Sequence, residues 1–528
     1  MIKRICASLP CLVVFTFCVI ALVLSSSFTD WHLVYAIDDS YIHLALARNL
    51  AETGVWGIRP DEYAFASSSP LWTCILAATF RLFGYHEIFA ALYAVFFCVA
   101  STFVVERIFA FGIESSLLRR ILTVGTMLAL PVTTAAILGM EHAMHVFSAV
   151  LLVYLYFRRA GPGAMFLAAF FAVGTRYESL FVVVPLLVIE LFQRRWRESL
   201  ALLTGALLVP LCYGAFSMAH DGCFLPNSLM IKSALSIRCT FFDRLLRAAI
   251  CGDAAANSVV QFTWVVLFTC ALAPGLTLRA RLLLLALAIS VFGHLVFAKT
   301  GWTYNINRYE MYLFAISIPV VVMASWHMKF VQPDRSLQRV LRLMGAVMGG
   351  IYMIVVLAYG LCSGTMALLV PREMYETPMI AADVLAAIPK ERQGAVFVND
   401  LGLIAERTAV PIIDVCGLGE QDTFELRRAG IRDTKNMAEV LKKRHARYAA
   451  VFPPPMWAST VLGAEFGLQP VAMLTRIHQD AWATGPLLLY AFDPDDEKFL
   501  ANHLCNLQFE FPEGVSFVLR EDLKKESE

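Results

Sequence analysis

Long apolar runs recur along most of this 528-residue chain, and they limit its possible folds more than any other feature. Each run has roughly 15–25 residues, close to the ~20 that an α-helix needs to cross a bilayer. Only 16% of the residues are charged, whereas soluble domains average about 25%. We therefore predict an α-helical polytopic membrane protein with about 11–13 membrane helices. The net charge of +1 provides no field that would attract nucleic acid, so the lipid bilayer is the partner that composition indicates.

The positions of these runs define a predicted membrane domain over residues 1–370. The first run, from about Leu9 to Leu24, is similar to a signal peptide, but the serines after it form only a fair cleavage site, so an uncleaved first span is favoured. Further spans are predicted at 70–84, 88–110, 120–138, 142–158, 163–174, 178–193, 199–217, 256–274, 281–298, 309–327 and 341–362.

Clusters of arginine and lysine between the spans predict which loops face the cytoplasm. They occur at 3–4, 119–120, 158–159, 194–197, 279–281 and 329–342. Placing them inside leaves the polar loops near Glu141, Arg176, Asn227 and Arg308 outside, together with Asp38. The region 70–112 does not fit this pattern, because it has to cross the membrane an odd number of times and yet contains two apolar segments. Either one of the two is a half-length or surface helix, or the 119–120 cluster faces outward.

Two adjacent carboxylates, Asp38 and Asp39, stand in the first predicted outer loop, residues 28–69. Charge beside a membrane span is costly to place, so such residues are candidates for a functional site. Apolar residues recur at helical spacing from Ile42 and predict a helix over 39–53 that lies on the membrane surface; the alternative is an ordinary loop helix. The carboxylates themselves suit a catalytic site, and they also suit a helix N-cap with a first-turn acid.

Composition changes after the last predicted span, and residues 371–528 hold most of the chain's Asp, Glu and Lys. Apolar segments at 394–400 and 410–417, with a helical stretch between them, predict a strand–helix–strand unit. Segments at 448–452 and 487–492 predict two more strands. We therefore expect a small soluble α/β domain over 371–528, which the topology places outside the cytoplasm.

Several short motifs, in this order along the chain, resemble those of one enzyme family. They are D-D-S-Y-I-H at 38–43, S-S-S-P-L-W at 67–72, G-M-E-H-A at 139–143, T-R-Y-E-S at 175–179, F-L-P-N-S at 224–228 with Lys232, N-R-Y at 307–309, N-D-L-G at 399–402 and I-D-V-C-G-L at 413–418. Their order and topological side resemble the GT-C superfamily of polyprenyl-phosphate-sugar glycosyltransferases, in particular the mycobacterial terminal β-arabinofuranosyltransferase type. Tyr177 and His142 depart from the family pattern, where Pro and Thr are usual, so the sugar and the acceptor stay open.

The resemblance implies a reaction and a set of site residues. Such enzymes transfer a sugar from a polyprenyl-phosphate donor to a glycan or lipid acceptor on the outer face of the bacterial inner membrane. The implied reaction is inverting, uses an Asp as general base, and needs no divalent metal or other cofactor. Asp38 is the preferred base, and Asp39 orients the acceptor or a cation. The other implied residues are Arg48, Arg176, Lys232 and Arg308 for the donor phosphate, and Glu141, Glu178, Asn227 and Tyr41 for the acceptor or sugar.

Other interpretations of the same residues stay open. The arginines can snorkel to the interface or pair with Glu178 and Glu310, and Glu141 can bond a neighbouring helix. A transporter or flippase of lipid-linked glycans would share the many spans and the intramembrane charges, although the span pattern shows no internal repeat. A non-catalytic scaffold whose outer domain binds glycan is a third interpretation.

Overall fold

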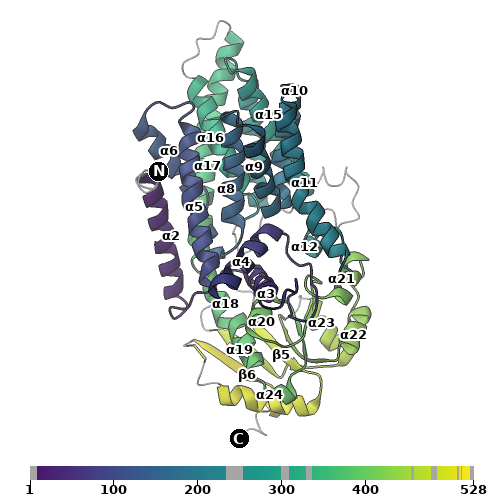
Figure 1. The fold of residues 1–528 in the computed structure, drawn as a ribbon. Helices are drawn as coiled ribbons and strands as arrows, with labels where there is room; N and C mark the ends of the chain where they lie inside the picture. The colour runs from purple at the N-terminus through teal and green to yellow at the C-terminus, as the bar shows by residue number, and fades with distance from the viewer. Residues whose placement is uncertain are drawn as a thin grey trace.

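The computed structural model describes residues 9–232, 254–298, 308–328, 336–453, 457–476, 485–507, 511–512 and 514–523. Figure 1 shows a bundle of long helices that stands on a smaller part built from a sheet and short helices. The bundle contains α2 (Leu9–Ser27), α5 (Ile88–Phe109), α6 (Ser116–Ala129), α7 (Val132–Leu138), α8 (His142–Phe157), α9 (Pro162–Thr175), α10 (Leu180–Phe192), α11 (Trp196–Met218), α14 (Ala254–Leu272), α15 (Leu278–Phe297), α16 (Met311–Met328) and α17 (Ser336–Ala367).

Several of these helices are long and apolar enough to cross a membrane. Among the described residues, five helical segments meet this criterion: α2, α5, α11, α15 and the stretch 343–386 that contains most of α17. Shorter apolar helices fill the rest of the bundle, and the predicted span at 120–138 is divided into α6 and α7. The break falls at Pro131, which has no N–H for a helical hydrogen bond. The predicted fold class, a helical membrane protein with a C-terminal α/β part, is confirmed.

Four of the predicted basic clusters, at 119–120, 158–159, 194–197 and 279–281, lie at one end of the bundle, whereas residues 3–4 and 329–335 lie outside the described part of the chain. Arg195 donates to the carbonyl of Ala160 at 2.8 Å, and Arg279 donates to a carbonyl at the end of α8. The rings of Phe111 and Phe157 stack at the same end, with 5.3 Å between their centres, and so join the loop after α5 to the last residue of α8. The charged motifs lie at the opposite end, beside the sheet.

Helix α4 (Pro70–Phe83) explains why residues 70–112 contain two apolar segments although they have to cross the membrane an odd number of times. Near its start, the Thr73 hydroxyl lies 3.3 Å from the ring Nδ1 of His43. Just beyond its end, the Tyr85 hydroxyl donates to Glu406 in the α/β part at 2.5 Å. Both ends of α4 therefore lie on one side of the bundle. The expectation of a span here was wrong, and the alternative of a helix confined to one face is confirmed; α5 makes the crossing.

Helix α3 (Asp38–Thr53) matches the helix predicted at 39–53, but its surroundings differ from the expectation. It lies between the bundle and the sheet, packed against α4 and α20 (Gly402–Arg407), as Figure 1 shows. Nine of its sixteen residues are buried. A helix on a membrane surface would expose one face to water and the other to lipid, so that interpretation was wrong. The alternative of an outer loop helix is closer, because protein covers most of α3.

The C-terminal part holds a six-stranded mixed sheet with the order β2-β1-β3-β5-β4-β6. Its strands are β1 (Ala395–Val398), β2 (Ile412–Asp414), β3 (Ala446–Val451), β4 (Ala472–Arg476), β5 (Leu487–Ala491) and β6 (Val515–Leu519). Strand β1 pairs in parallel with β2 and β3, and the other neighbours pair antiparallel. The strand predictions at β1, β2, β3 and β5 are confirmed, whereas β4 and β6 were not predicted.

Helices cover both faces of this sheet because successive strand residues point to opposite sides. Val396 and Val398 pack with α20 and with residues of α3, whereas Phe397 packs with α22 and α23 on the other face. The shorter helices are α12 (Asn227–Lys232), α18 (Val370–Met374), α19 (Ile380–Ala386), α21 (Gln421–Arg428), α22 (Thr434–Lys443), α23 (Trp457–Phe466) and α24 (Pro494–Leu507). Helical turns occur at Tyr177–Ser179, Tyr375–Met379 and Lys390–Arg392. One apolar core therefore runs from the sheet into α3 and α4.

Candidate active site

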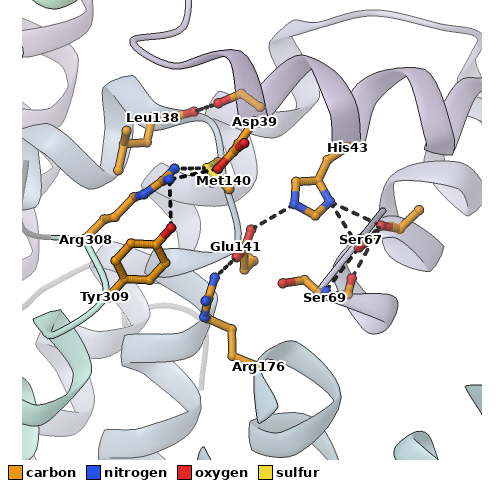
Figure 2. Close-up of polar contacts among 12 residues, drawn as sticks. Asp39, His43, Ser67, Ser69, Leu138, Met140, Glu141, Arg176, Arg308 and Tyr309 are labelled. Atoms are coloured by element: carbon orange, nitrogen blue, oxygen red, sulfur yellow. Dashed lines mark hydrogen bonds and ion pairs between the residues drawn. The ribbon is translucent and has the colours of Figure 1, made fainter. Parts of the chain in front are cut away.

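Four helix boundaries bring charged side chains together at the end of the bundle beside the sheet (Figure 2). They are the start of α3, the turn between α7 and α8, the break between α9 and α10, and the residues just before α16. The turn between α7 and α8 depends on Gly139, whose φ of +60° is in the left-handed region. A Cβ at this position would lie 2.2 Å from the Tyr35 ring. Because Gly139 has no side chain, the Tyr35 ring can pack against this turn just before α3 begins. The Ser40 hydroxyl in α3 then donates to the Leu138 carbonyl at 2.6 Å.

Asp39 and Arg308 form an ion pair in this site, with 2.8 Å between Oδ2 and Nη2. The Arg308 side chain is 5% exposed and that of Asp39 is 22% exposed. The same Nη2 donates to the Tyr309 hydroxyl at 2.9 Å, and the guanidinium lies 4.8 Å from the centre of that ring. By contrast, Nη1 donates to the Met140 thioether at 3.4 Å, and a thioether is a weak acceptor. A stronger acceptor, such as a phosphate oxygen, could replace it.

Arg176 is held more tightly, by two carboxylates. It pairs with Glu141, which is fully buried, and with Glu178 at 2.6 Å. Glu141 lies between Arg176 and His43, whose Nε2 is 3.5 Å from the second carboxylate oxygen (Figure 2). The Arg176 guanidinium also lies 5.3 Å from the centre of the Tyr309 ring. Tyr309 therefore contacts both arginines, while the strong donors of Arg176 are already used within the protein.

A cavity of about 310 Å³ lies beside these groups. Its charged and polar wall includes Asp39, His43, Arg176, Glu178 and Arg308. Much of the other wall is apolar, from Leu180, Phe181, Phe297 and Ala298 at the facing ends of α10 and α15, together with Leu418 of the α/β part. Small-molecule sites commonly measure about 300–1,000 Å³ and combine apolar walls with a few placed polar groups. The cavity fits that description, and its size suits a phosphate or sugar group rather than a large ligand.

Asp38 does not line this cavity, although it precedes Asp39 directly. Its two carboxylate oxygens accept hydrogen bonds from the backbone N–H groups of Gly402 and Leu403, at 2.7 and 2.8 Å. Burial and the nearby Asp400 carboxylate raise the pKa of Asp38, and the two N–H groups act against this rise. The geometry therefore disagrees with the preference for Asp38 as base, because both its oxygens are bound to the start of α20.

Arg48 also lies away from the cavity, and its expected phosphate role disagrees with the structure. Its guanidinium donates to the carbonyls of Glu406 and Ala405, at 2.7 and 3.3 Å, and lies over the Tyr85 ring. Tyr41 is likewise absent from the cavity wall, since it is fully buried and its hydroxyl accepts the N–H of Tyr35 at 3.0 Å. Both residues therefore support α3 and its neighbours rather than a ligand.

Asn227 lies at the edge of the site, and its side-chain amide donates to the Leu418 carbonyl at 3.2 Å. It thereby ties the start of α12 to the α/β part, next to Ser228 in the cavity wall. The side chain of Lys232 and the whole of Asn307 lie outside the described part of the structure. The predictions for Lys232 therefore stay predictions.

Sequence reasoning did not single out Tyr309 or Met140 as functional residues. The available signal was their direct adjacency to Arg308 and Glu141 within the N-R-Y and G-M-E motifs. His43, in the cavity wall, also lies within 3.3 Å of the Ser67 and Thr73 hydroxyls. Within the described ranges, no three His, Cys, Asp or Glu side chains are grouped in a way that could hold a metal ion.

Comparisons with known proteins bear on the fold. No family model matches the sequence, and no curated protein matches it. Among solved structures, the chain is similar to ArnT from Cupriavidus metallidurans bound to undecaprenyl phosphate, with a TM-score of 0.50 and 14% identity, over 91% of this chain and 98% of that chain. ArnT in the apo state gives a TM-score of 0.48 at the same identity and coverage. A structure of arabinofuranosyltransferase AftD from Mycobacteria gives a TM-score of 0.45 and 14% identity, over 91% of this chain and 41% of that chain. The chain therefore has the fold of ArnT.

Proposed function

We propose that the chain is a membrane glycosyltransferase that moves a sugar from a polyprenyl-phosphate donor to a glycan or lipid acceptor. The reaction takes place at the outer face of a bacterial inner membrane. The observation that carries this proposal is the Asp39–Arg308 pair in the wall of the cavity. ArnT, whose fold the chain shares, was solved with undecaprenyl phosphate bound, and this supports a polyprenyl phosphate as the ligand.

The donor phosphate binds at Arg308. A guanidinium can grip phosphate oxygens with parallel hydrogen bonds, and among the described residues the Nη1 of Arg308 donates to the Met140 sulfur, a weak acceptor that it can give up. Arg176 also lines the cavity, but its strong donors stay on Glu141 and Glu178, whose two charges outweigh its own, so Arg308 supplies the positive charge. The apolar wall at the ends of α10 and α15 supports a lipid carrier, because the chain of such a donor has to leave the site through apolar surroundings.

Asp39 acts as the general base. Its carboxylate faces the cavity and is held beside a cation, so it stays oriented toward the space where an acceptor hydroxyl would lie. A positioned base contributes about 10²–10⁴ to the rate of such a transfer. Glu178 in the cavity wall, with Glu141 behind it, is the candidate group for sugar or acceptor hydroxyls.

The transfer is a single displacement at the anomeric carbon. The acceptor oxygen forms the new bond to this carbon while its proton passes to Asp39, and the bond from the carbon to the phosphate oxygen breaks. The leaving polyprenyl phosphate takes the electron pair, and Arg308 stabilises the added negative charge. One displacement inverts the configuration of the sugar. The positive charge comes from arginine, so we propose that transfer needs no divalent metal and continues in EDTA.

The test is sugar transfer by the purified chain in lipid vesicles, with radiolabelled polyprenyl-phosphate sugars and a glycan acceptor. Asp39→Asn should lower the turnover by about 10²–10⁴ while the protein stays folded. Glu52→Gln is the matched control, since this acid is exposed at the other end of the same helix and should keep full activity. Full activity in Asp39→Asn would contradict the assignment of the base. Movement of the intact donor across the bilayer without transfer would instead support the flippase alternative.

A further inference from the structure

Helix α20 of the α/β part is held at both of its ends by side chains of α3. At its start, the Gly402 and Leu403 N–H groups donate to the Asp38 carboxylate at 2.7 and 2.8 Å. At its other end, the carbonyls of Ala405 and Glu406 accept from Arg48 at 3.3 and 2.7 Å. The first N–H groups and the last carbonyls of a helix have no partners inside the helix. The N–H groups attract negatively charged side chains, and the carbonyls attract positively charged ones. The two α3 side chains satisfy both ends with the matching charge.

The two backbones also approach closely at this contact. A Cβ on Gly402 would lie 2.2 Å from the Asp38 carbonyl oxygen and 2.8 Å from the Ile42 nitrogen. Because these atoms are backbone, they cannot rotate away as the end of a side chain could. Leu403 and Ile42 are buried in the same apolar core, so α3 and α20 pack as one unit. We call the contacts of Asp38 and Arg48 with α20 the α3–α20 clamp.

The clamp fixes the helix that carries the proposed base. Asp38 and Asp39 are consecutive in the first turn of α3, so their side chains point about 100° apart. One points to α20 and the other to Arg308, which belongs to the bundle. The position of Asp39 relative to Arg308 therefore depends on how the α/β part is docked. Leu418, which the α/β part contributes to the cavity wall, depends on the same docking.

We propose that Asp38 is a positioning residue that docks the α/β part on α3 and thereby sets the geometry of the Asp39–Arg308 pair. Arg48 has the same role at the other end of α20. This proposal rests on the proposed function for its catalytic readout only. The α/β part is then a structural component of the catalytic site, whether or not it touches the acceptor.

The decisive comparison is Asp38→Asn against Asp38→Ala. Asparagine keeps one acceptor oxygen at the reach of the aspartate, whereas alanine keeps none, and an amide cannot act as the base. We expect Asp38→Ala to lower kcat by about 5–30-fold, because the Gly402 and Leu403 N–H groups lose their acceptors, with the donor KM unchanged. Asp38→Asn should recover part of this loss. Hydrogen exchange of residues 400–407 should speed up in Asp38→Ala and return part of the way toward wild type in Asp38→Asn.

A second pair of variants tests the contact from the other side. Gly402→Ala should separate α20 from α3, lower kcat and speed up the same exchange, although Gly402 is absent from the cavity wall. Gly463→Ala, in α23 of the same part, is the control because a Cβ there meets nothing within 4 Å. It should leave both readouts at the wild-type level.

The outcomes separate the two proposals. Unchanged exchange in Asp38→Ala would overturn the clamp. Loss of activity in Asp38→Asn as complete as in Asp39→Asn, with exchange near the wild-type rate, would overturn the positioning role and leave the proposed reaction standing. If the wild-type chain transfers no sugar, the proposed function fails, and the exchange data still decide whether Asp38 docks α20.

Discussion

Replacing Gly139 by alanine should destabilise the chain, and the structure supplies the magnitude. Gly139 has a φ of +60°, and a left-handed conformation costs an L-residue roughly 1–2 kcal/mol. The new Cβ would also lie 2.2 Å from a carbon of the Tyr35 ring. That ring cannot swing aside easily, because its hydroxyl donates to the Glu87 carbonyl at 2.6 Å and accepts the Ala91 N–H at 3.2 Å. Overpacking of this kind costs about 1–3 kcal/mol, so the total is about 2–5 kcal/mol.

The measurement is thermal unfolding of the purified protein in detergent, followed by tryptophan fluorescence. Gly125→Ala is the control, since Gly125 lies inside α6 and a Cβ there meets nothing within 4 Å. Alanine is the better helix former by up to about 1 kcal/mol, so this variant should unfold at the wild-type temperature or above it. Gly139→Ala should unfold at a clearly lower temperature. Equal midpoints for the two variants would refute the argument from φ and from the Tyr35 contact.

Three further changes have defined expectations. Arg308→Lys keeps the charge but loses the planar fork, so kcat/KM for the donor should fall by about 10–150-fold in steady-state transfer assays, the equivalent of about 1.5–3 kcal/mol. Burial and the Glu406 carboxylate raise the pKa of Glu87 to about 7 from an ordinary 4.5, so its stabilising contribution is complete below pH ~4.5 and lost as the pH rises through about 7. Glu87 should therefore lower the free energy of unfolding by up to about 3 kcal/mol between pH 5 and pH 8, measured by thermal melting, and Glu87→Gln should remove this share of the pH dependence. Glu141→Gln leaves the buried Arg176 one carboxylate instead of two, and melting should show a loss of about 1–3 kcal/mol.

Local patterns in the sequence were sufficient for much of the fold. The helical spacing of apolar residues predicted α3 within one residue of its observed start, because that face packs into a core. The basic clusters between residues 119 and 281 predicted which bundle end carries their loops. The count of membrane crossings was wrong at α4, because its apolar composition is that of a span. Thr73 near its start and Tyr85 just after its end contact His43 and Glu406, and both contacts lie on one side of the bundle. Strands β4 and β6 were not predicted because their apolar pattern is weak: β4 ends in Thr475 and Arg476, and β6 alternates in exposure at the sheet edge.

The roles inside the acidic pair could not be predicted from the sequence. Motif spacing put Asp38 and Asp39 in one site with Arg176, Glu178 and Arg308, and the structure does bring Asp39 together with these three. Nothing local distinguishes the two carboxylates, because the partners of Asp38 lie 364 and 365 residues later in the chain. Arg48 was misassigned for the same reason, since its partners lie 357 and 358 residues away.

The long sequence separation between α3 and α20 has a consequence for the synthesis of the protein. α3 emerges early from the ribosome, but α20 follows only after some 360 further residues, which takes roughly 20–70 s at ordinary synthesis rates. During that time the nascent bundle carries Asp39 on a helix without its docking partner. We expect a chain that stops before Ala395 to insert into the membrane and yet to remain inactive. The carboxylate proposed as the base would thus reach its docked position only after the α/β part has been made.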